Sequence, residues 1–288
     1  MRYEAPETLD AALGLLAEAG GAARLLAGGT DVLVQMRAGR LAPSLLVDVK
    51  RIPELQSLEP CDGGWRVGAA VTGMELIEHE PFAAAWPGIV DGVRMIGSIQ
   101  VKGRATLGGN LCNASPAADS VPALIAAGAL VTLVGPAGRR EVPVEHIATG
   151  PGRTCLAAGE VLVSFVLPPR PPRSADAYLR FTPRTEMDIA VVGAGVNLTL
   201  DAGGVCRQAR VSLGAVAERA LLVPEAAAAL VGTRIDDAAL QRLAEAASAA
   251  CRPIDDKRGT REFRTCVAGV LARRAAERAL ERARRSCR

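Results

Sequence analysis

Two short glycine-rich segments are the part of this 288-residue sequence best suited to hold a ligand. The first is Gly28-Gly29-Thr30, and the second is Gly108-Gly109 with Thr106 just before it. Glycine has no Cβ and readily adopts positive φ, so consecutive glycines let backbone N–H groups approach an anionic group closely. Each threonine hydroxyl offers a further donor. If the fold brings the two segments together, they could hold the two phosphates of a dinucleotide.

The first segment also lies where a helix begins. A predicted strand over 23–27 precedes it and a predicted helix over 32–36 follows it, so the helix dipole would favour an anion at the turn. Taken alone, however, a double glycine is more typical of an ordinary turn. The prediction of a ligand site therefore depends on both segments acting together.

Other chemistries find little support in the sequence. Gly193-Ala194-Gly195 begins like a Rossmann fingerprint, but Leu198 replaces the third glycine and the sequence continues as a strand. Neither a P-loop lysine motif nor a GxSxG elbow occurs. The seven cysteines include no CxxC pair and only two histidines are present, so no metal or cluster has a local ligand set. We assign no catalytic or metal-binding residue to this chain and expect reduced, mostly buried thiols.

Composition and charge narrow the setting in which the chain works. Apolar residues make up 49% of it, but no apolar run approaches the roughly 20 residues of a membrane span. The first residues lack the order of a secretory signal, so we expect a cytoplasmic protein. Between Lys257 and Arg288, eleven Lys or Arg accompany three Glu, an excess of +8 against +3 for the whole chain. No nucleic-acid motif accompanies this basic end, so we expect it to be solvated or to contact a partner subunit, not nucleic acid.

The pattern of elements predicts two domains. Residues 1–50 indicate helix, strand, glycine turn, helix and strand, a small α/β unit. The proline-rich run 168–172 is the best boundary, because proline lacks a ladder donor and stiffens linkers. We predict a first domain over 1–172, with parts of about 1–54 and 55–172, and an α+β domain over 173–288. Further strands are expected over 64–71, 130–134, 140–144, 161–167, 189–200 and 205–216, and further helices over 73–80, 89–96, 121–127, 222–230, 238–250 and 260–284.

The two glycine segments and three further motifs resemble the FAD-binding medium subunit of the carbon monoxide dehydrogenase and xanthine dehydrogenase family of molybdenum hydroxylases. The motifs, which span the chain in the family's order, are Ala27-Gly28-Gly29-Thr30-Asp31, Ala105-Thr106-Leu107-Gly108-Gly109-Asn110-Leu111, Ala114-Ser115-Pro116-Ala117-Ala118-Asp119, Gly159-Glu160-Val161-Leu162 and Arg184-Thr185-Glu186-Met187-Asp188-Ile189-Ala190. Their combination is specific, although each alone is not. The resemblance implies an α+β fold: a two-part FAD-binding domain of the vanillyl-alcohol oxidase / PCMH type, then a small α+β domain with an antiparallel sheet and helices.

The resemblance further implies non-covalent FAD. The glycines and threonines would hold the pyrophosphate, Asp119 would accept a hydrogen bond from a FAD hydroxyl, and Leu162 would form an apolar wall. Position 180 is commonly lysine in the family, and Arg180 keeps the charge with a different geometry. From the residues alone, Asp119 could instead cap the helix beginning at Ser120, and Arg180 could be a surface cation. The residues expected to contact FAD are Ala27, Gly28, Gly29, Thr30, Asp31, Thr106, Gly108, Gly109, Asn110, Asp119, Leu162 and Arg180.

Partners follow from the same resemblance. In this family a large subunit carries the molybdenum cofactor and a small one carries two [2Fe–2S] clusters, so we expect a dimer of heterotrimers. Electrons would pass from the partner's clusters to FAD and on to an external acceptor. Two alternatives remain: a stand-alone non-covalent flavin oxidase, and a non-catalytic interaction protein that has lost FAD. The substrate would be chosen on another chain, and this sequence holds no trace of it.

Overall fold

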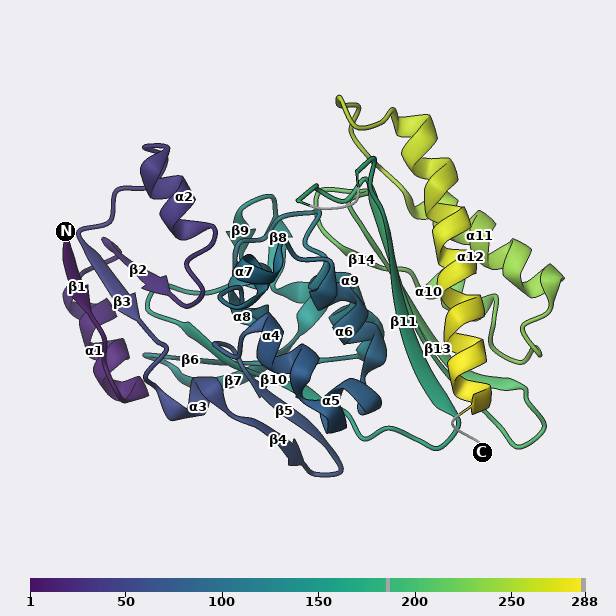
Figure 1. Cartoon of the computed structure of the whole chain (residues 1–288), viewed down its shortest axis with the longest axis horizontal. Coiled ribbons are helices and arrows are strands. Elements are labelled where there is room, and N and C mark those ends of the chain that lie inside the picture. The colour runs from purple at the N-terminus through teal and green to yellow at the C-terminus, as the bar shows by residue number, and fades with distance from the viewer. Residues whose placement is uncertain (185–186, 286–288) are drawn as a thin grey trace.

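The computed structural model describes residues 1–184 and 187–285. Thr185 and Glu186 of the last motif, and residues 286–288 with Cys287, lie outside the described residues. Three units follow one another along the chain, each with its own sheet and hydrophobic core (Figure 1).

The first unit is a three-stranded parallel sheet in the order β1-β3-β2. Thr8 caps its first helix by accepting a hydrogen bond from the N–H of Ala11 at 3.2 Å. The predicted helix, strand, helix and strand are all present, and the N-terminal strand β1 was not predicted because it is three residues long and largely exposed. The elements are β1 (Arg2–Glu4), α1 (Leu9–Glu18), β2 (Ala23–Leu26), α2 (Val32–Arg37) and β3 (Leu45–Asp48).

The second unit is a five-stranded antiparallel sheet in the order β4-β5-β10-β6-β7, packed against short helices. Helix α9 is buried along its whole length, which puts it between this sheet and the third unit. The strands of this sheet are β4 (Leu58–Cys61), β5 (Gly64–Gly68), β6 (Leu130–Gly135), β7 (Gly138–Pro143) and β10 (Val161–Leu167), and β8 (Ala148–Gly150) and β9 (Arg153–Thr154) form a separate two-stranded antiparallel sheet. The helices are α3 (Pro53–Gln56), α4 (Gly73–Glu78), α5 (Glu80–Ala85), α6 (Pro87–Arg94), α7 (Ile99–Lys102), α8 (Leu107–Cys112), α9 (Ser120–Ala127) and the 3-10 turn Val144–His146.

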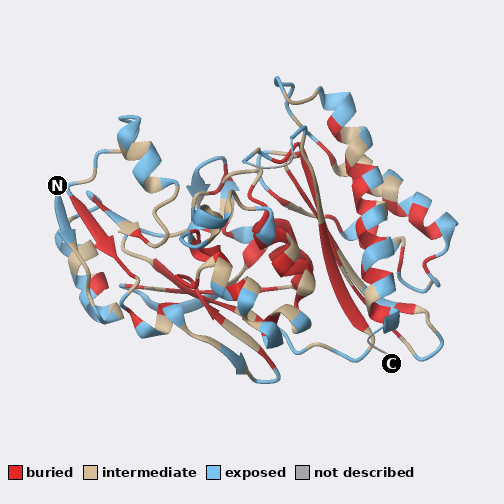
Figure 2. Cartoon of the chain, in the orientation of Figure 1, coloured by how far each residue is buried: buried red, intermediate tan, exposed pale blue. Residues whose placement is uncertain are grey.

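The third unit is a four-stranded antiparallel sheet in the order β11-β12-β13-β14, with α9 on one face and the long helix α12 on the other (Figure 1). Alanines dominate the buried side of α12, so the helix lies close to the sheet. The elements are β11 (Ser174–Phe181), β12 (Val192–Leu200), β13 (Cys206–Gly214), β14 (Leu221–Leu222), α10 (Pro224–Ala228), α11 (Asp237–Ala250) and α12 (Arg261–Arg285). The predicted α+β class is confirmed, and Figure 2 shows the buried residues gathered on the sheets, on α9 and on the inner side of α12.

Further sequence-based expectations also differ from the structure. Strand β11 was not predicted, because the polar residues Asp176 and Arg180 interrupt its apolar sequence although the first five residues of the strand are buried. The second glycine segment is not a loop but the first turn of α8. The expectation of mostly buried thiols is wrong: only Cys206 and Cys251 are buried among the six described cysteines, all of them free. Within the described ranges, no helix combines the length and apolar character needed to cross a membrane.

The glycines of the Rossmann-like run serve packing between layers. A Cβ built on Gly195 would lie 2.6 Å from the carbonyl oxygen of Pro122 in α9 and 2.8 Å from Oγ of Ser212. The backbone of β12 therefore touches α9 directly, and Gly193–Gly195 is strand, as predicted.

Replacing Gly195 with alanine should destabilise the fold by about 1–3 kcal/mol, because the backbone of α9 or β12 must move to admit a methyl group. Urea unfolding measures the change. Gly203→Ala in the β12–β13 turn is the matched control, because its Cβ would meet only Oδ1 of Asp201 at 3.4 Å. Equal stability of the two variants would contradict the packing role.

Candidate ligand cavity

A cavity of about 580 Å³ lies where the first unit meets the second. This volume falls in the range of small-molecule and cofactor sites. Of the twelve predicted contact residues, all but Asp119 and Arg180 line it, so residues far apart in the sequence converge on one site. The predicted residues that line the cavity are Ala27, Gly28, Gly29, Thr30, Asp31, Thr106, Gly108, Gly109, Asn110 and Leu162.

The first glycine segment follows β2 and turns sharply into α2. Gly29 has φ of +76°, which glycine adopts without strain. Leu33 donates back to the carbonyl of Gly29 at 3.1 Å, which closes the turn. Among the described residues, the backbone N–H groups of residues 28–31 have no protein acceptor. Four adjacent donors at a cavity wall are suited to an anionic ligand.

The second glycine segment is arranged differently. Thr106 caps α8, and its Oγ1 accepts the N–H of Gly109 at 3.0 Å. The N–H of Gly108 donates to the carbonyl of Ala69 at 3.2 Å. Both glycine N–H groups are thus used within the protein, and what this segment offers the cavity is a wall without side chains.

In each pair, one glycine allows two backbones to pack closely, and the other borders the cavity. A Cβ on Gly28 would overlap the carbonyl group of Arg104, and one on Gly108 would lie 2.6 Å from the carbonyl oxygen of Ala69. A Cβ on Gly109 would instead meet only Oγ1 of Thr106, at 3.1 Å, and Gly109 is exposed on the cavity wall. The first glycine of each pair therefore allows backbones to touch, and Gly109 leaves space for a ligand.

Two hydrogen bonds between side chains fix the second glycine segment relative to its neighbours. Nε2 of Gln35 in α2 donates to Oδ1 of Asn113, just after α8, at 3.1 Å. Oδ1 of Asn110 accepts from Oγ of Ser120 at 2.7 Å, which joins α8 to α9. Leu162, 4% exposed on β10, supplies an apolar part of the opposite wall.

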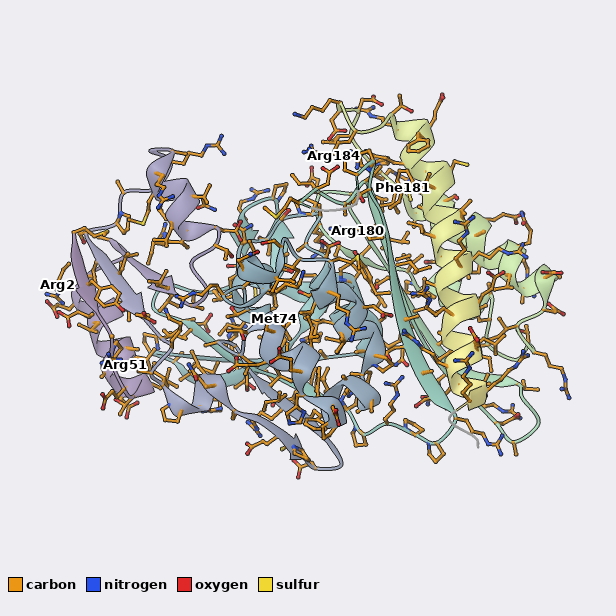
Figure 3. The ribbon with its side chains drawn as sticks, in the orientation of Figure 1. Arg2, Arg51, Met74, Arg180, Phe181 and Arg184 are labelled. Carbon is orange, nitrogen blue, oxygen red and sulfur yellow. The ribbon has the colours of Figure 1, made fainter. Side chains whose placement is uncertain are left out.

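Asp119 and Arg180 do not line the cavity but form a buried ion pair beside it, 2.8 Å apart. The hydroxyl of Tyr178 donates to the same carboxylate at 2.9 Å. Nη1 of Arg180 also donates to the carbonyl oxygens of Met95, at 3.0 Å, and Asp188, at 3.3 Å. Figure 3 shows Arg180 on β11 next to Phe181 and near Arg184.

Asp119 occupies the N-cap position of α9, as its simpler interpretation predicted, but its side chain does not cap the helix, and the simpler interpretation of Arg180 is wrong. The carboxylate of Asp119 makes no capping bond to α9, because it faces Tyr178 and Arg180. The side chain of Arg180 is 5% exposed and so is no surface cation. Burial raises the pKa of Asp119 to about 6, against the opposing effects of the Arg180 charge and the Tyr178 hydrogen bond.

Several residues of the site were not singled out in the sequence. Ile96, Cys112 and Asn113 line the cavity, and Lys50 donates to the carbonyl of Ala27 in the first glycine segment. Of these residues, only Lys50 could have been found from the sequence. It lies two residues beyond β3, at the carboxyl edge of a parallel sheet, where ligands commonly bind.

The family comparisons cover nearly the whole chain. A family described as the FAD binding domain in molybdopterin dehydrogenase matches residues 1–170. A second, described as the CO dehydrogenase flavoprotein C-terminal domain, matches residues 177–279.

Individual proteins give the same result. The carbon monoxide dehydrogenase medium chain of Afipia carboxidovorans is 35% identical over 282 residues, 98% of this chain and 97% of that one. A putative xanthine dehydrogenase FAD-binding subunit of Escherichia coli is 31% identical over 91% of this chain and 90% of its own. Among solved structures, a reconstituted CO dehydrogenase from Oligotropha carboxidovorans has a TM-score of 0.94 at 34% identity, covering 98% of each chain. Quinoline 2-oxidoreductase from Pseudomonas putida has a TM-score of 0.90 at 31% identity, with the same coverage.

Arg180→Ala should destabilise the protein by about 3 kcal/mol at neutral pH, because it leaves the buried Asp119 carboxylate without its cation. The Arg180 charge lowers the pKa of Asp119, so its removal raises the folded-state pKa further above about 6. In the wild type the folded carboxyl ionises above about 6, whereas in the variant it stays neutral to higher pH, so the loss grows as pH rises from about 6 towards the folded-state pKa of the variant. Urea unfolding at several pH values measures it.

Arg180→Lys is the control for this prediction, because it keeps the charge and should retain most of the stability. A loss of equal size at all pH values would show that the ion pair is not its cause.

Proposed function

The chain belongs to the family of FAD-binding domains in molybdopterin dehydrogenases, and we propose that it is the FAD-binding electron-transfer subunit of a multi-subunit molybdenum hydroxylase. The resemblance inferred from the glycine segments is confirmed, as is the fold of a two-part FAD-binding domain followed by a small α+β domain. The observation that carries the proposal is the convergence of both glycine segments on one cavity.

The cavity fits a dinucleotide held without a covalent bond. We place the FAD pyrophosphate against the free N–H groups of residues 28–31. The bare wall at Gly109 lets the phosphates approach α8, and the Thr106 hydroxyl lies just behind it. Leu162 and neighbouring apolar residues would pack against a ring. Asp119 and Arg180 fix the wall from outside, because Arg180 binds the carbonyl of Met95, next to the lining residue Ile96.

Bound FAD supplies the redox chemistry, and the chain supplies binding, orientation and exclusion of water. The residues lining the cavity include no histidine and no cysteine ligand pair, and no group of three or more metal-ligating side chains occurs among the described residues. We infer that this subunit passes electrons between partners and leaves the substrate chemistry to another chain.

The partners we propose are a large subunit with the molybdenum cofactor and a small subunit with two [2Fe–2S] clusters, arranged as a dimer of heterotrimers. The names of the relatives support this, because "medium chain" and "FAD-binding subunit" describe parts of larger enzymes. They also favour it over a stand-alone oxidase or a protein that has lost FAD. We further propose a cytoplasmic location, with electrons leaving to an external acceptor.

We also propose that the first domain spans residues 1–172, with parts of about 1–54 and 55–172, and that the second spans 173–288. Two observations support the main boundary. The proline-rich run lies between β10 and β11. The first family match ends at residue 170, and the second begins at residue 177.

Gly109→Val should abolish FAD binding while the fold is retained, because the new side chain would occupy the cavity wall without striking the backbone. Absorbance of the bound flavin and fluorescence titration of the apoprotein measure binding, and far-UV circular dichroism reports the fold. Gly14→Val is the matched control: Gly14 is also an exposed helical glycine, but it lies outside the cavity with no atom within 4 Å of its Cβ. Normal FAD affinity of Gly109→Val would refute the site.

The isolated chain reconstituted with FAD should not turn over a substrate with O₂ at a rate approaching that of the assembled complex, because neither the metal nor the clusters belong to it. Steady-state assays of the chain alone and of the co-purified complex test this. Efficient turnover by the chain alone would establish the oxidase alternative, and failure of the wild-type chain to take up FAD would establish the interaction protein.

A further inference from the structure

A polar network lies beneath the first glycine segment, and its side chains are outside the cavity lining. Nζ of Lys50 donates to both carboxylate oxygens of Asp48, each at 2.7 Å, and to the carbonyl oxygen of Ala27 at 3.0 Å. The hydroxyl of Tyr3 donates to Oδ2 of Asp48 at 2.6 Å. The network joins β1, the end of β3 and the turn after β2, and Figure 3 labels Arg51, the residue after Lys50.

The network is largely shielded from water. Asp48 is 6% exposed, and the side chain of Lys50 is 24% exposed. Burial alone would raise the pKa of Asp48, but the hydrogen bonds from Lys50 and Tyr3 outweigh it and lower that pKa. The carboxylate is therefore charged, and it holds the ammonium group of Lys50 in one place. Charge-assisted hydrogen bonds of this kind are among the stronger ones in proteins.

The bond from Lys50 to Ala27 fixes more than one carbonyl group. The peptide between Ala27 and Gly28 is planar and trans, so its C=O and N–H point in opposite directions. When Lys50 binds the carbonyl oxygen, the N–H of Gly28 must point away from Lys50. Both residues line the cavity, and that N–H has no acceptor among the residues described.

The same peptide is held from a second side. Gly28 packs against the carbonyl group of Arg104 so closely that a Cβ would overlap it. The Cα of Gly28 is thus fixed against the Arg104–Ala105 backbone, and rotation of the Ala27–Gly28 peptide plane about this end would break the bond to Lys50.

We propose that Lys50 is a positioning residue for the pyrophosphate of FAD: its ammonium group, held by Asp48 and Tyr3, orients the Ala27–Gly28 peptide so that the N–H of Gly28 faces the phosphates. This inference rests on the proposed FAD site. Lys50 acts through the peptide and not by direct contact, since it does not line the cavity. The fixed N–H costs no reorganisation when FAD binds.

The test compares Lys50→Met, Lys50→Arg and Arg252→Met in the full chain. Loss of one charge-assisted bond and its orienting effect should weaken FAD binding by about tenfold or more in Lys50→Met. Binding of ADP, which carries the same pyrophosphate, should weaken by a similar factor. Lys50→Arg, which can still donate to Asp48 and Ala27, should restore affinity to within about threefold of wild type. Arg252→Met is the matched control, because Arg252 also donates to backbone carbonyls, those of Ala249 at 2.8 Å and Cys251 at 2.6 Å, in the third unit and away from the cavity lining.

Titration of FAD and ADP, with the thermal midpoint of each apoprotein, separates the outcomes. FAD and ADP affinities of Lys50→Met within twofold of wild type would overturn the inference while leaving the FAD site intact. A wild-type chain without FAD affinity would instead remove the proposed function itself. If Lys50→Met does not fold, Asp48→Asn keeps the shape of the side chain and loosens its hold on Lys50, so it should weaken FAD and ADP equally, and unchanged affinities there would reject the proposal.

Discussion

The close approach of two backbones at Gly28 is the contact on which the cavity depends. Gly28 lies against the carbonyl of Arg104, and no side chain fits between them. This contact joins the parallel β1-β3-β2 unit to the antiparallel five-stranded unit, and the cavity lies where the two meet. Any other residue at 28 would force the two units apart and widen the site, so the glycine is required by packing before it is required by a ligand.

The two glycine pairs look alike in the sequence but do different work. The first presents a row of free N–H groups, and the second uses its N–H groups to build α8 and offers a bare wall. A ligand with a compact anionic centre and apolar ends suits such an asymmetric site. One wall donates hydrogen bonds to the anionic centre, and the other leaves space for it because it carries no side chain. The Lys50 network adds rigidity on the donating side, where orientation of a peptide plane matters most.

The C-terminal unit contributes to the site through its contacts with the second unit. Helix α9 packs directly on β12 at Gly195, and the Asp119–Arg180 pair joins the start of α9 to β11. Arg282 of α12 adds a second link through its 2.7 Å ion pair with Asp91 in α6. The Asp119–Arg180 pair is buried and costly to break from one side, so it holds the third unit in a fixed place against the start of α9.

The sequence by itself determined the family, the ligand class and most of the elements. Ten of the twelve residues that the family resemblance implied line one cavity, and the four glycines among them could also be singled out by their residue type and pairing. Local signals could also place Thr8 as a cap and 161–167 as a strand. Only the tertiary structure decided the rest: that Asp119 and Arg180 form a pair beside the cavity, that Gly108 lies in the first turn of a helix, and that Lys50 reaches Ala27. These outcomes depend on which distant residues meet, and a carboxylate, an arginine or a lysine acquires its partner and its burial only when the units pack.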